Sequence, residues 1–267
     1  MDLKLDNYFT AYPIIFVHGI AKGVDAWKRT AKIISNDNYY EMRYIEEDKV
    51  YHNFYGERPQ QWIWSISYYT TNPIEESLFG DLTLYAQRLN KIIDLIKKIT
   101  NRDKVILVAH SMGGLVARKY MTLKEENWET VHKILTVGSP HQGVITSVGI
   151  VGQLKDLASN SEFIKELKKD WEKLYINNNK KWGVIGAIDK TKFYNRNNSP
   201  HATDSGGPGF VRISSSIPYN EWQDAIKKLN QANYNTPHFG FRLAVDATHL
   251  DLLFHKGTFK GIQWTIE

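Results

Sequence analysis

The sequence predicts a single α/β domain, in which helices cover both faces of a mostly parallel sheet. Apolar runs of strand length alternate along the chain with segments whose apolar residues recur at helical spacing. The runs at 13–19 and 105–109 are almost continuously apolar, which is typical of parallel strands buried on both faces. Because no repeat, linker or low-complexity tract divides the 267 residues, we expect one domain over 1–267.

Strands and helices are expected to alternate along most of the chain. The helix at 81–100 has the clearest pattern, because its apolar residues form one stripe and Asp81 stands at its N-cap position. The predicted strands lie at 13–19, 62–69, 105–109, 131–137, 184–188 and 241–245, and further helices are predicted at 24–34 and 112–123.

Two segments do not fit this alternation and are expected to be insertions. Residues 144–181 carry an amphipathic helical pattern that no predicted strand interrupts, so we expect a helical cap, or lid, above the sheet. The second insertion is expected at about 39–60, where aromatic residues are frequent. Aromatic clusters usually belong to the core, but in such segments they can also line an apolar substrate cleft.

Ser111 stands at the junction between the apolar run at 105–109 and the helical pattern that follows. Small residues flank it at Ala109, Gly113 and Gly114, as a serine on a tight strand-to-helix turn requires. Such a turn holds the hydroxyl clear of the sheet and directs the first amides of the helix toward a developing oxyanion. We therefore predict that Ser111 is a catalytic nucleophile rather than part of an ordinary glycine-rich loop.

A serine nucleophile needs an imidazole base, which follows the serine in the sequence in this class of sheet. His249 comes one short loop after the strand predicted at 241–245, at the same sheet edge as Ser111. His238 precedes that strand, and His255 lies one or two helical turns further on. We expect His249 to be the base and keep His238 as the alternative. The other histidines after the serine are His132, His141 and His201.

The carboxylate that orients the base should also follow a strand of the sheet. Asp189 comes directly after the strand predicted at 184–188, whereas Asp204 comes after a polar loop and precedes a glycine-rich segment. We favour Asp204 and keep Asp189 as the alternative. Asp246 is too close in sequence to His249 to be a good partner from a separate strand.

An oxyanion hole requires two backbone amides beside the nucleophile. Met112, directly after Ser111, is expected to supply one of them. Ile20 is expected to supply the other, because His18-Gly19 follows the first predicted strand and glycine allows a close approach of the backbone.

These motifs together resemble those of the bacterial lipases of the α/β-hydrolase superfamily. The matches run from residue 13 to about residue 255, and Ala109 stands where the bacillus-type variant of the family also has alanine. In Asp204–Ser215 the insertion Ser205–Pro208 departs from the compact turn of the family. The similar segments are the oxyanion loop 17–20, the elbow 109–114, the pre-lid segment 138–143, the triad-acid segment 204–215 and the histidine segment 248–251.

The resemblance implies an α/β-hydrolase fold and a serine carboxylic-ester hydrolase, a lipase acting on acylglycerol or other lipid-like esters. Ser111, His249 and Asp204 would form its triad and pass through an acyl-enzyme. The alternatives are an esterase, thioesterase, amidase or acyltransferase on the same scaffold, or a non-catalytic lipid-binding homologue. In calcium-dependent relatives an aspartate at the position of Asp251 binds the ion. No second ligand can be placed in this sequence, so no metal or other cofactor is expected.

Composition limits the partners. The net charge is +5 and the sequence pI is about 9.0, but the positive charges are spread among acids, so nucleic-acid binding is not expected. The chain has no cysteine and no apolar run of membrane-spanning length. We expect a small acyl-ester or lipid substrate and transient contact with a lipid interface. Because no signal-peptide core is present, either a cytoplasmic protein or a secreted mature form fits.

Overall fold

The computed structural model of the chain describes residues 10–46, 49–55, 63–70, 76, 80–144, 153–175, 180–192, 199–204 and 211–267. In these ranges one sheet contains the strands β1 (Ile14–Val17), β2 (Tyr40–Tyr44), β3 (Val50–His52), β4 (Ile63–Ser67), β5 (Val105–His110), β6 (Val131–Val137), β7 (Trp182–Ile188), β8 (Asn233–Tyr234) and β9 (Phe241–Asp246).

The sheet is mostly parallel, as predicted. Its strand order is β3-β2-β4-β1-β5-β6-β7-β9-β8, and only the edge strands β3 and β8 run antiparallel to their neighbours. β5 lies near the centre, between β1 and β6, and every one of its residues is buried. In this register Ala109 lies beside Val17 on one side and Thr136 on the other. The strand that leads to Ser111 is therefore held rigidly on both sides.

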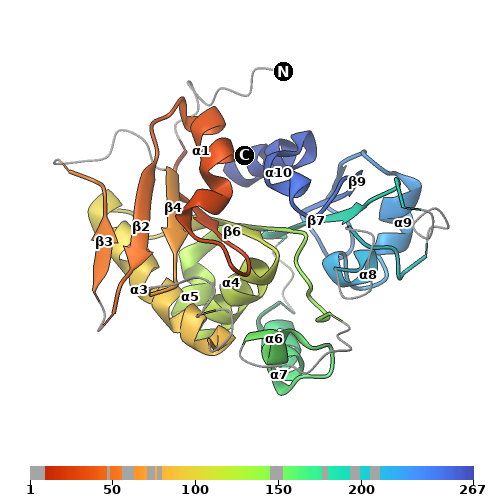
Figure 1. Ribbon diagram of the computed structural model, residues 1–267, viewed down its shortest axis with the longest axis horizontal. Coiled ribbons are helices and arrows are strands. Elements are labelled where there is room, and N and C mark those ends of the chain that lie inside the picture. The colour runs from red at the N-terminus through yellow and green to blue at the C-terminus, as the bar shows by residue number, and fades with distance from the viewer. Residues whose placement is uncertain are drawn as a thin grey trace.

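Helices cover both faces of the sheet, as the alternating pattern predicts (Figure 1). One face carries the helices α1 (Lys28–Ser35) and α10 (Lys256–Ile266) with the short 3-10 helices η1 (Val24–Trp27) and η3 (Asp251–Phe254). The other face carries α3 (Leu82–Thr100), α4 (Met112–Leu123), α5 (Glu125–Thr130), α6 (Gln153–Leu157), α7 (Glu162–Tyr175), α8 (Ile213–Ser216) and α9 (Trp222–Lys227).

The longest helix, α3, follows its sequence pattern closely. The Asp81 side chain accepts a hydrogen bond of 2.8 Å from the amide of Leu84, so it caps the helix as expected. One face of α3 packs against α4, and its residues Leu89, Ile92, Ile93 and Ile96 are fully buried. Leu84, in contrast, is 41% exposed. Burial of this stripe fixes α3 and α4 on one another.

The two expected insertions differ in structure. In the region 39–60, residues 40–44 and 50–52 form β2 and β3, which extend the central sheet at one edge. In the region 144–181, the described residues form α6 and α7, outside α4 in Figure 1. The apolar stripe of α7 is buried against α4, and Trp171 packs on Trp182 with 4.9 Å between ring centroids. A role of this segment as a moving lid stays a prediction.

None of the helices in the described ranges has both the length and the apolar character that a membrane span requires.

Two of the leucines of α3, one buried and one exposed, allow a test of how much of the stability comes from this helix face. Leu89→Ala should lower the free energy of unfolding by about 3 kcal/mol, because it leaves a cavity in a fully buried layer. Leu84→Ala makes the same chemical change on the exposed side and should cost less than about 1 kcal/mol. Urea denaturation of both variants measures the difference. Equal losses of unfolding free energy in the two variants would contradict the burial of Leu89 in the core.

Candidate active site

Ser111 lies in the tight turn between β5 and α4. Its backbone has φ 54° and ψ −131°, a combination that residues with a side chain rarely adopt. The amide of Ser111 donates a hydrogen bond of 2.9 Å to the carbonyl of Val137, at the end of the neighbouring strand β6. This strand-to-helix turn has the strained backbone that the sequence pattern predicts for a nucleophile elbow, and the role of Ser111 as a nucleophile stays a prediction.

The turn requires small residues around Ser111. A Cβ added to Gly19 would lie 2.9 Å from the Cβ of Ser111, closer than carbon atoms pack. A Cβ at Gly113 would collide with the carbonyl oxygen of His18, so the first turn of α4 can lie directly against the loop after β1 only with glycine there. The glycines therefore bring that loop and the start of α4 together beside the serine.

His249 and Asp204 complete a hydrogen-bonded chain that begins at Ser111. The Nε2 atom of His249 is 2.9 Å from Ser111 Oγ, and its Nδ1 atom is 2.5 Å from Asp204 Oδ2. The amide of His249 also donates to the carbonyl of Asp204 at 2.7 Å, so the two loops are joined through their backbones as well. Asp204 is fully buried, and only 16% of the His249 side chain is exposed.

The structure brings neither alternative acid to this imidazole. Asp189 follows β7 as predicted, but its Oδ1 accepts hydrogen bonds from the amide and hydroxyl of Thr191. Asp246 accepts from the amide of Lys190. Among the described residues, Asp204 is thus the carboxylate that contacts His249.

The other histidines lie elsewhere. His238 precedes β9 and contacts Glu221, 3.0 Å away, and His255 caps α10 through a hydrogen bond from Gly257. His141 is buried beside Thr136 and Arg118, His132 packs on Tyr12, and His201 lies at an exposed turn after 199.

His110 supports His249 in a way that the sequence analysis missed. Its Nε2 atom donates to the carbonyl of His249 at 3.0 Å, and the two rings lie 4.5 Å apart. Burial, and secondarily the nearby His249, hold the pKa of His110 well below its usual value, so its ring is neutral and can keep this hydrogen bond. The residue stands inside the elbow motif, but nothing local in the sequence indicates where its ring points.

The loop that contains Ile20 is fixed by aromatic contacts. The ring of His18 stacks on Tyr68 with 4.0 Å between centroids, and the Tyr68 hydroxyl donates to the carbonyl of His18 at 2.8 Å. Burial lowers the pKa of His18 to about 4. Met112 is the first residue of α4, a position whose N–H has no acceptor within the helix. Gly19, the residue before Ile20, lies against Ser111, and Met112 follows Ser111 directly. The role of Ile20 and Met112 as the two oxyanion amides stays a prediction.

A cavity of about 590 Å³ opens beside this loop. Its wall includes the loop residues Lys22 and Asp25 and, from the sheet edge, Arg43. Residues with hydroxyl groups also line it, at Tyr44, Tyr51, Ser67, Tyr69 and Thr70, together with the apolar residues Ala21, Val24, Ala26, Ile45 and Leu253. Such a mixed lining has groups that can hydrogen-bond to a ligand that bears several hydroxyls.

In the ranges that the structure describes, no three His, Cys, Asp or Glu side chains come close enough together to hold a metal ion. The carboxylate of Asp251 accepts a hydrogen bond of 2.6 Å from the hydroxyl of Thr248.

Taken together, the arrangement can activate a serine hydroxyl. A neutral imidazole within 2.9 Å of the hydroxyl can accept its proton, and a buried carboxylate on the other ring nitrogen stabilises the cation that forms. Amides at a helix start beside the serine can stabilise negative charge on a substrate oxygen.

Comparison with known proteins gives one family. Residues 8–195 match the model of the PGAP1-like alpha/beta domain. A GPI inositol-deacylase of Candida albicans is 29% identical over 134 residues, which are 48% of this chain and 31% of that protein. The chain therefore spans about a third of the length of this curated relative.

Solved structures share the fold at low sequence identity. The product of gene lin2722 from Listeria innocua is 15% identical, with a TM-score of 0.59 over 96% of this chain and 94% of that one. The lipase BlEst2 of Bacillus licheniformis is 16% identical, with a TM-score of 0.51 over 96% and 91% of the two chains. The predicted α/β-hydrolase fold is confirmed, and the closer resemblance to bacterial lipases stays a prediction.

The buried neutral histidines predict how stability depends on pH. Because burial lowers the pKa values of His18, His110 and His141 below the unfolded value of 6.5, the unfolded chain binds more protons below that pH. Stability should therefore fall as the pH is lowered from 7 to 5, with each such histidine contributing up to about 1.4 kcal/mol per pH unit.

Urea denaturation at several pH values measures this slope. His18→Gln should reduce the slope by up to one histidine's share, because glutamine does not titrate. His201→Gln, at an exposed position, is the matched control and should leave the slope unchanged. A free energy of unfolding that stays constant from pH 7 to 5 would contradict the burial of neutral histidines.

Proposed function

The chain belongs to the family of PGAP1-like α/β domains, and from this we propose that it is a serine carboxylic-ester hydrolase of lipid-like esters. The observation that carries the proposal is the hydrogen-bonded chain from Ser111 through His249 to Asp204, built on a strained serine turn. In this proposal the three residues are the nucleophile, the base and the orienting acid.

The proposed reaction has two halves. Ser111 Oγ attacks the acyl carbonyl carbon while its proton passes to Nε2 of His249, 2.9 Å away. The bond between the acyl carbon and the alcohol oxygen then breaks, and the imidazolium returns the proton to the leaving alcohol. Water then attacks the acyl-enzyme while its proton passes to the same nitrogen. The bond between the acyl carbon and Ser111 Oγ breaks, the imidazolium returns the proton to Oγ, and the carboxylic acid is released.

The remaining groups would stabilise charge during these steps. Asp204 would offset the positive charge on His249, and its burial keeps this interaction free of competing water. The amides of Ile20 and Met112 would receive the oxyanion of each tetrahedral intermediate. His110 would be a positioning residue, because it holds the carbonyl of His249 rather than the substrate.

Two observations support an ester whose alcohol part is polar. The cavity of about 590 Å³ beside the loop of Ile20 is lined by hydroxyl groups and by three charged side chains. The Candida albicans relative carries the name of a deacylase for the inositol of GPI, and inositol is a polyol. We therefore infer that the alcohol part of the substrate is a polyol and lies in this cavity, while the acyl carbonyl lies at Ser111.

Removal of the serine hydroxyl tests the nucleophile. Ser111→Ala should lower kcat/KM for a p-nitrophenyl ester by at least about 10³-fold and abolish labelling by a fluorophosphonate probe. Ser139→Ala is the matched control, since Ser139 is another buried serine just after a neighbouring strand, β6. Retained labelling of Ser111→Ala would contradict the proposal. Matched ester, thioester and amide substrates measure which acyl bond the wild-type protein cleaves.

Substitution of Asp204 and of Asp189 tests which carboxylate orients His249. Asp204→Asn should lower kcat by about 10³- to 10⁴-fold, because an amide no longer favours the productive tautomer of His249 or stabilises its cation. Asp189→Asn removes the same charge 15 positions earlier, from a carboxylate that bonds Thr191, and should leave kcat close to the wild-type value. Steady-state kinetics on the folded variants decide. A greater loss of kcat in Asp189→Asn than in Asp204→Asn would show that Asp189, and not Asp204, is the acid.

A further inference from the structure

Arg118 is a buried cation in the middle of α4, and it does not belong to the proposed catalytic groups. Only 4% of its surface is exposed. Among the described residues its hydrogen-bond partner is His141, whose Nδ1 accepts from Nη1 at 3.1 Å, and its Nε atom has none. No carboxylate oxygen of the described ranges lies within 4.0 Å of its guanidinium group.

His141 does not compensate this charge. Its Nδ1 accepts from Arg118, so the proton of the neutral ring lies on Nε2, which faces the hydroxyl of Thr136 at 2.9 Å. Burial, together with the charge of Arg118, holds the pKa of His141 well below its usual value. The histidine is thus neutral, and the positive charge of Arg118 remains without a negative partner.

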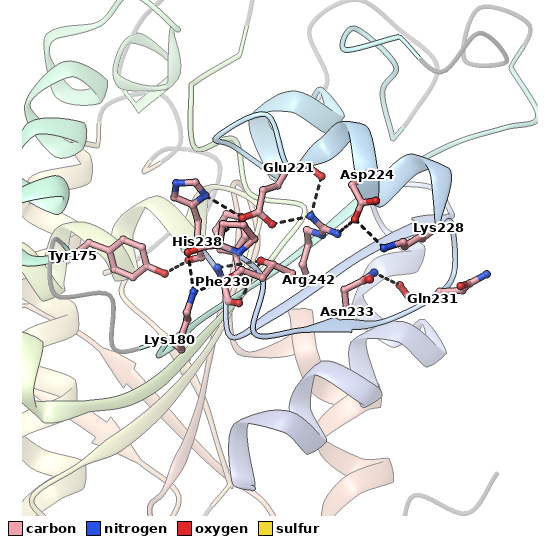
Figure 2. Close-up of polar contacts among 12 residues, drawn as sticks. Tyr175, Lys180, Glu221, Asp224, Lys228, Gln231, Asn233, His238, Phe239 and Arg242 are labelled. Atoms are coloured by element: carbon pink, nitrogen blue, oxygen red, sulfur yellow. Dashed lines mark hydrogen bonds and ion pairs between the residues drawn. The ribbon is translucent and has the colours of Figure 1, made fainter.

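Among the described residues, the second buried arginine, Arg242, has the carboxylate partners that Arg118 lacks. Arg242, on β9, is also 4% exposed on its side chain, but its guanidinium group binds the carboxylates of Glu221, at 2.7 Å, and Asp224 (Figure 2). Glu221 in turn contacts His238. Buried charges are normally paired in this way, because an isolated charge is costly to remove from water.

Two tryptophans hold Arg118 in place. Its guanidinium carbon lies 4.4 Å from the ring centre of Trp171, on α7, and 4.7 Å from that of Trp182, on β7. Both contacts are of the cation–π type. They orient the side chain but do not neutralise its charge, which the more distant carboxylate of Glu172 stabilises in part. Burial lowers the pKa of Arg118 only to about 10, so the group is cationic at neutral pH.

A cavity of about 600 Å³ opens onto this guanidinium group, between α4, α7 and the segment 218–220. Lys165 and Lys168, on α7, stand at its exposed rim, with Glu172 as the acidic residue of its lining. Lys165 lies 3.5 Å from Glu162 and Lys168 lies 4.0 Å from Glu172, and both of these ion pairs are exposed. The cavity lining itself contains the three cations and, of the carboxylates, Glu172. We call this space the α4–α7 cavity. Its apolar walls are Ile164, Trp182 and Pro218.

We propose that the α4–α7 cavity binds the phosphate group of a phosphomonoester, with Arg118 at its base and Lys165 and Lys168 at its rim. A phosphate group offers several oxygens to the planar guanidinium fork and carries up to two charges, which matches the excess of cations. The cavity volume also leaves room for an organic part against the apolar wall.

This site is separate from the proposed catalytic serine. Arg118 stands seven residues after Ser111, about 10 Å along the axis of α4. The bound phosphate would therefore not replace the acyl group at Ser111. The same phosphate chemistry occurs in soluble phosphomonoesters and in the head group of phosphatidic acid, and the experiment distinguishes these sources.

Titration with inorganic phosphate and with glycerol 3-phosphate, followed by tryptophan fluorescence and calorimetry, tests the proposal. The double variant Lys165→Gln/Lys168→Gln should weaken binding at least tenfold. The matched control Lys169→Gln/Lys173→Gln makes the same charge change on the same helix, outside the cavity lining, and should bind like the wild type. Equal weakening in both double variants, or no saturable binding of either soluble probe or of the vesicles below, would overturn the proposal.

Two further variants examine the base of the cavity. Arg118→Gln should abolish saturable binding, and Arg118→Lys, which keeps the charge, should retain part of it. If either variant fails to fold, as judged by its thermal transition, the lysine variants still decide. Ser111→Ala should bind phosphate like the wild type, so failure of this proposal and failure of the proposed hydrolase function give different results.

Vesicles identify the source of the phosphate group. Cosedimentation with phosphatidylcholine vesicles that contain phosphatidic acid is compared with pure phosphatidylcholine vesicles. Binding to the former alone, lost in Lys165→Gln/Lys168→Gln but not in Lys169→Gln/Lys173→Gln, supports a lipid phosphate. Saturable binding of glycerol 3-phosphate without vesicle binding supports a soluble phosphomonoester.

Discussion

The backbone of Ser111 is the constraint on which the arrangement of the site depends. A non-glycine residue at φ 54° and ψ −131° costs on the order of 1–3 kcal/mol, so the surroundings must enforce it. They do so through the fully buried strand β5 on one side of the residue and the hydrogen bond to Val137 beside it. The start of α4 is fixed by the same turn, and with it the direction of the whole helix. The serine hydroxyl and Arg118 are thus both positioned by one strand-to-helix junction.

The parallel sheet explains which parts of the site were predictable. Ser111 and His249 each follow a strand with a recognisable apolar run, and parallel strands bring their carboxyl ends to one edge. Asp204 does not follow its strand directly. The amide of Asp189 donates to the carbonyl of Thr203 at 3.0 Å, so the chain returns to the end of β7 just before Asp204. That return is a long-range backbone contact, which no local pattern in the sequence indicates, and it is why the choice between the two aspartates stayed open.

The strands that the sequence analysis missed are short or only partly buried. In β2 the exposed Arg43 alternates with buried neighbours, and β3 and β8 are three and two residues long. Strands at the sheet edge or next to it, such as these, lack the continuous apolar run that identifies a central strand. The stripe of α7 was recognised, but an apolar stripe indicates only that one face is covered. That its partners are α4 and Trp182 follows from the tertiary structure.

Arg118 illustrates the same limit for charge. In the sequence it is one basic residue on an amphipathic helix, where a solvated position is the ordinary expectation. Its burial results from α7, whose Trp171 covers one face of the guanidinium group, and from β7, which supplies Trp182. These contacts join α7 to α4, the helix that begins directly after Ser111. A buried cation thus anchors α7 to α4. An apolar residue at this position could fill the space between the two rings without the cost of burying a charge. The charge itself is therefore the feature that stability does not explain, and the cavity beside it is where that charge can act on a ligand.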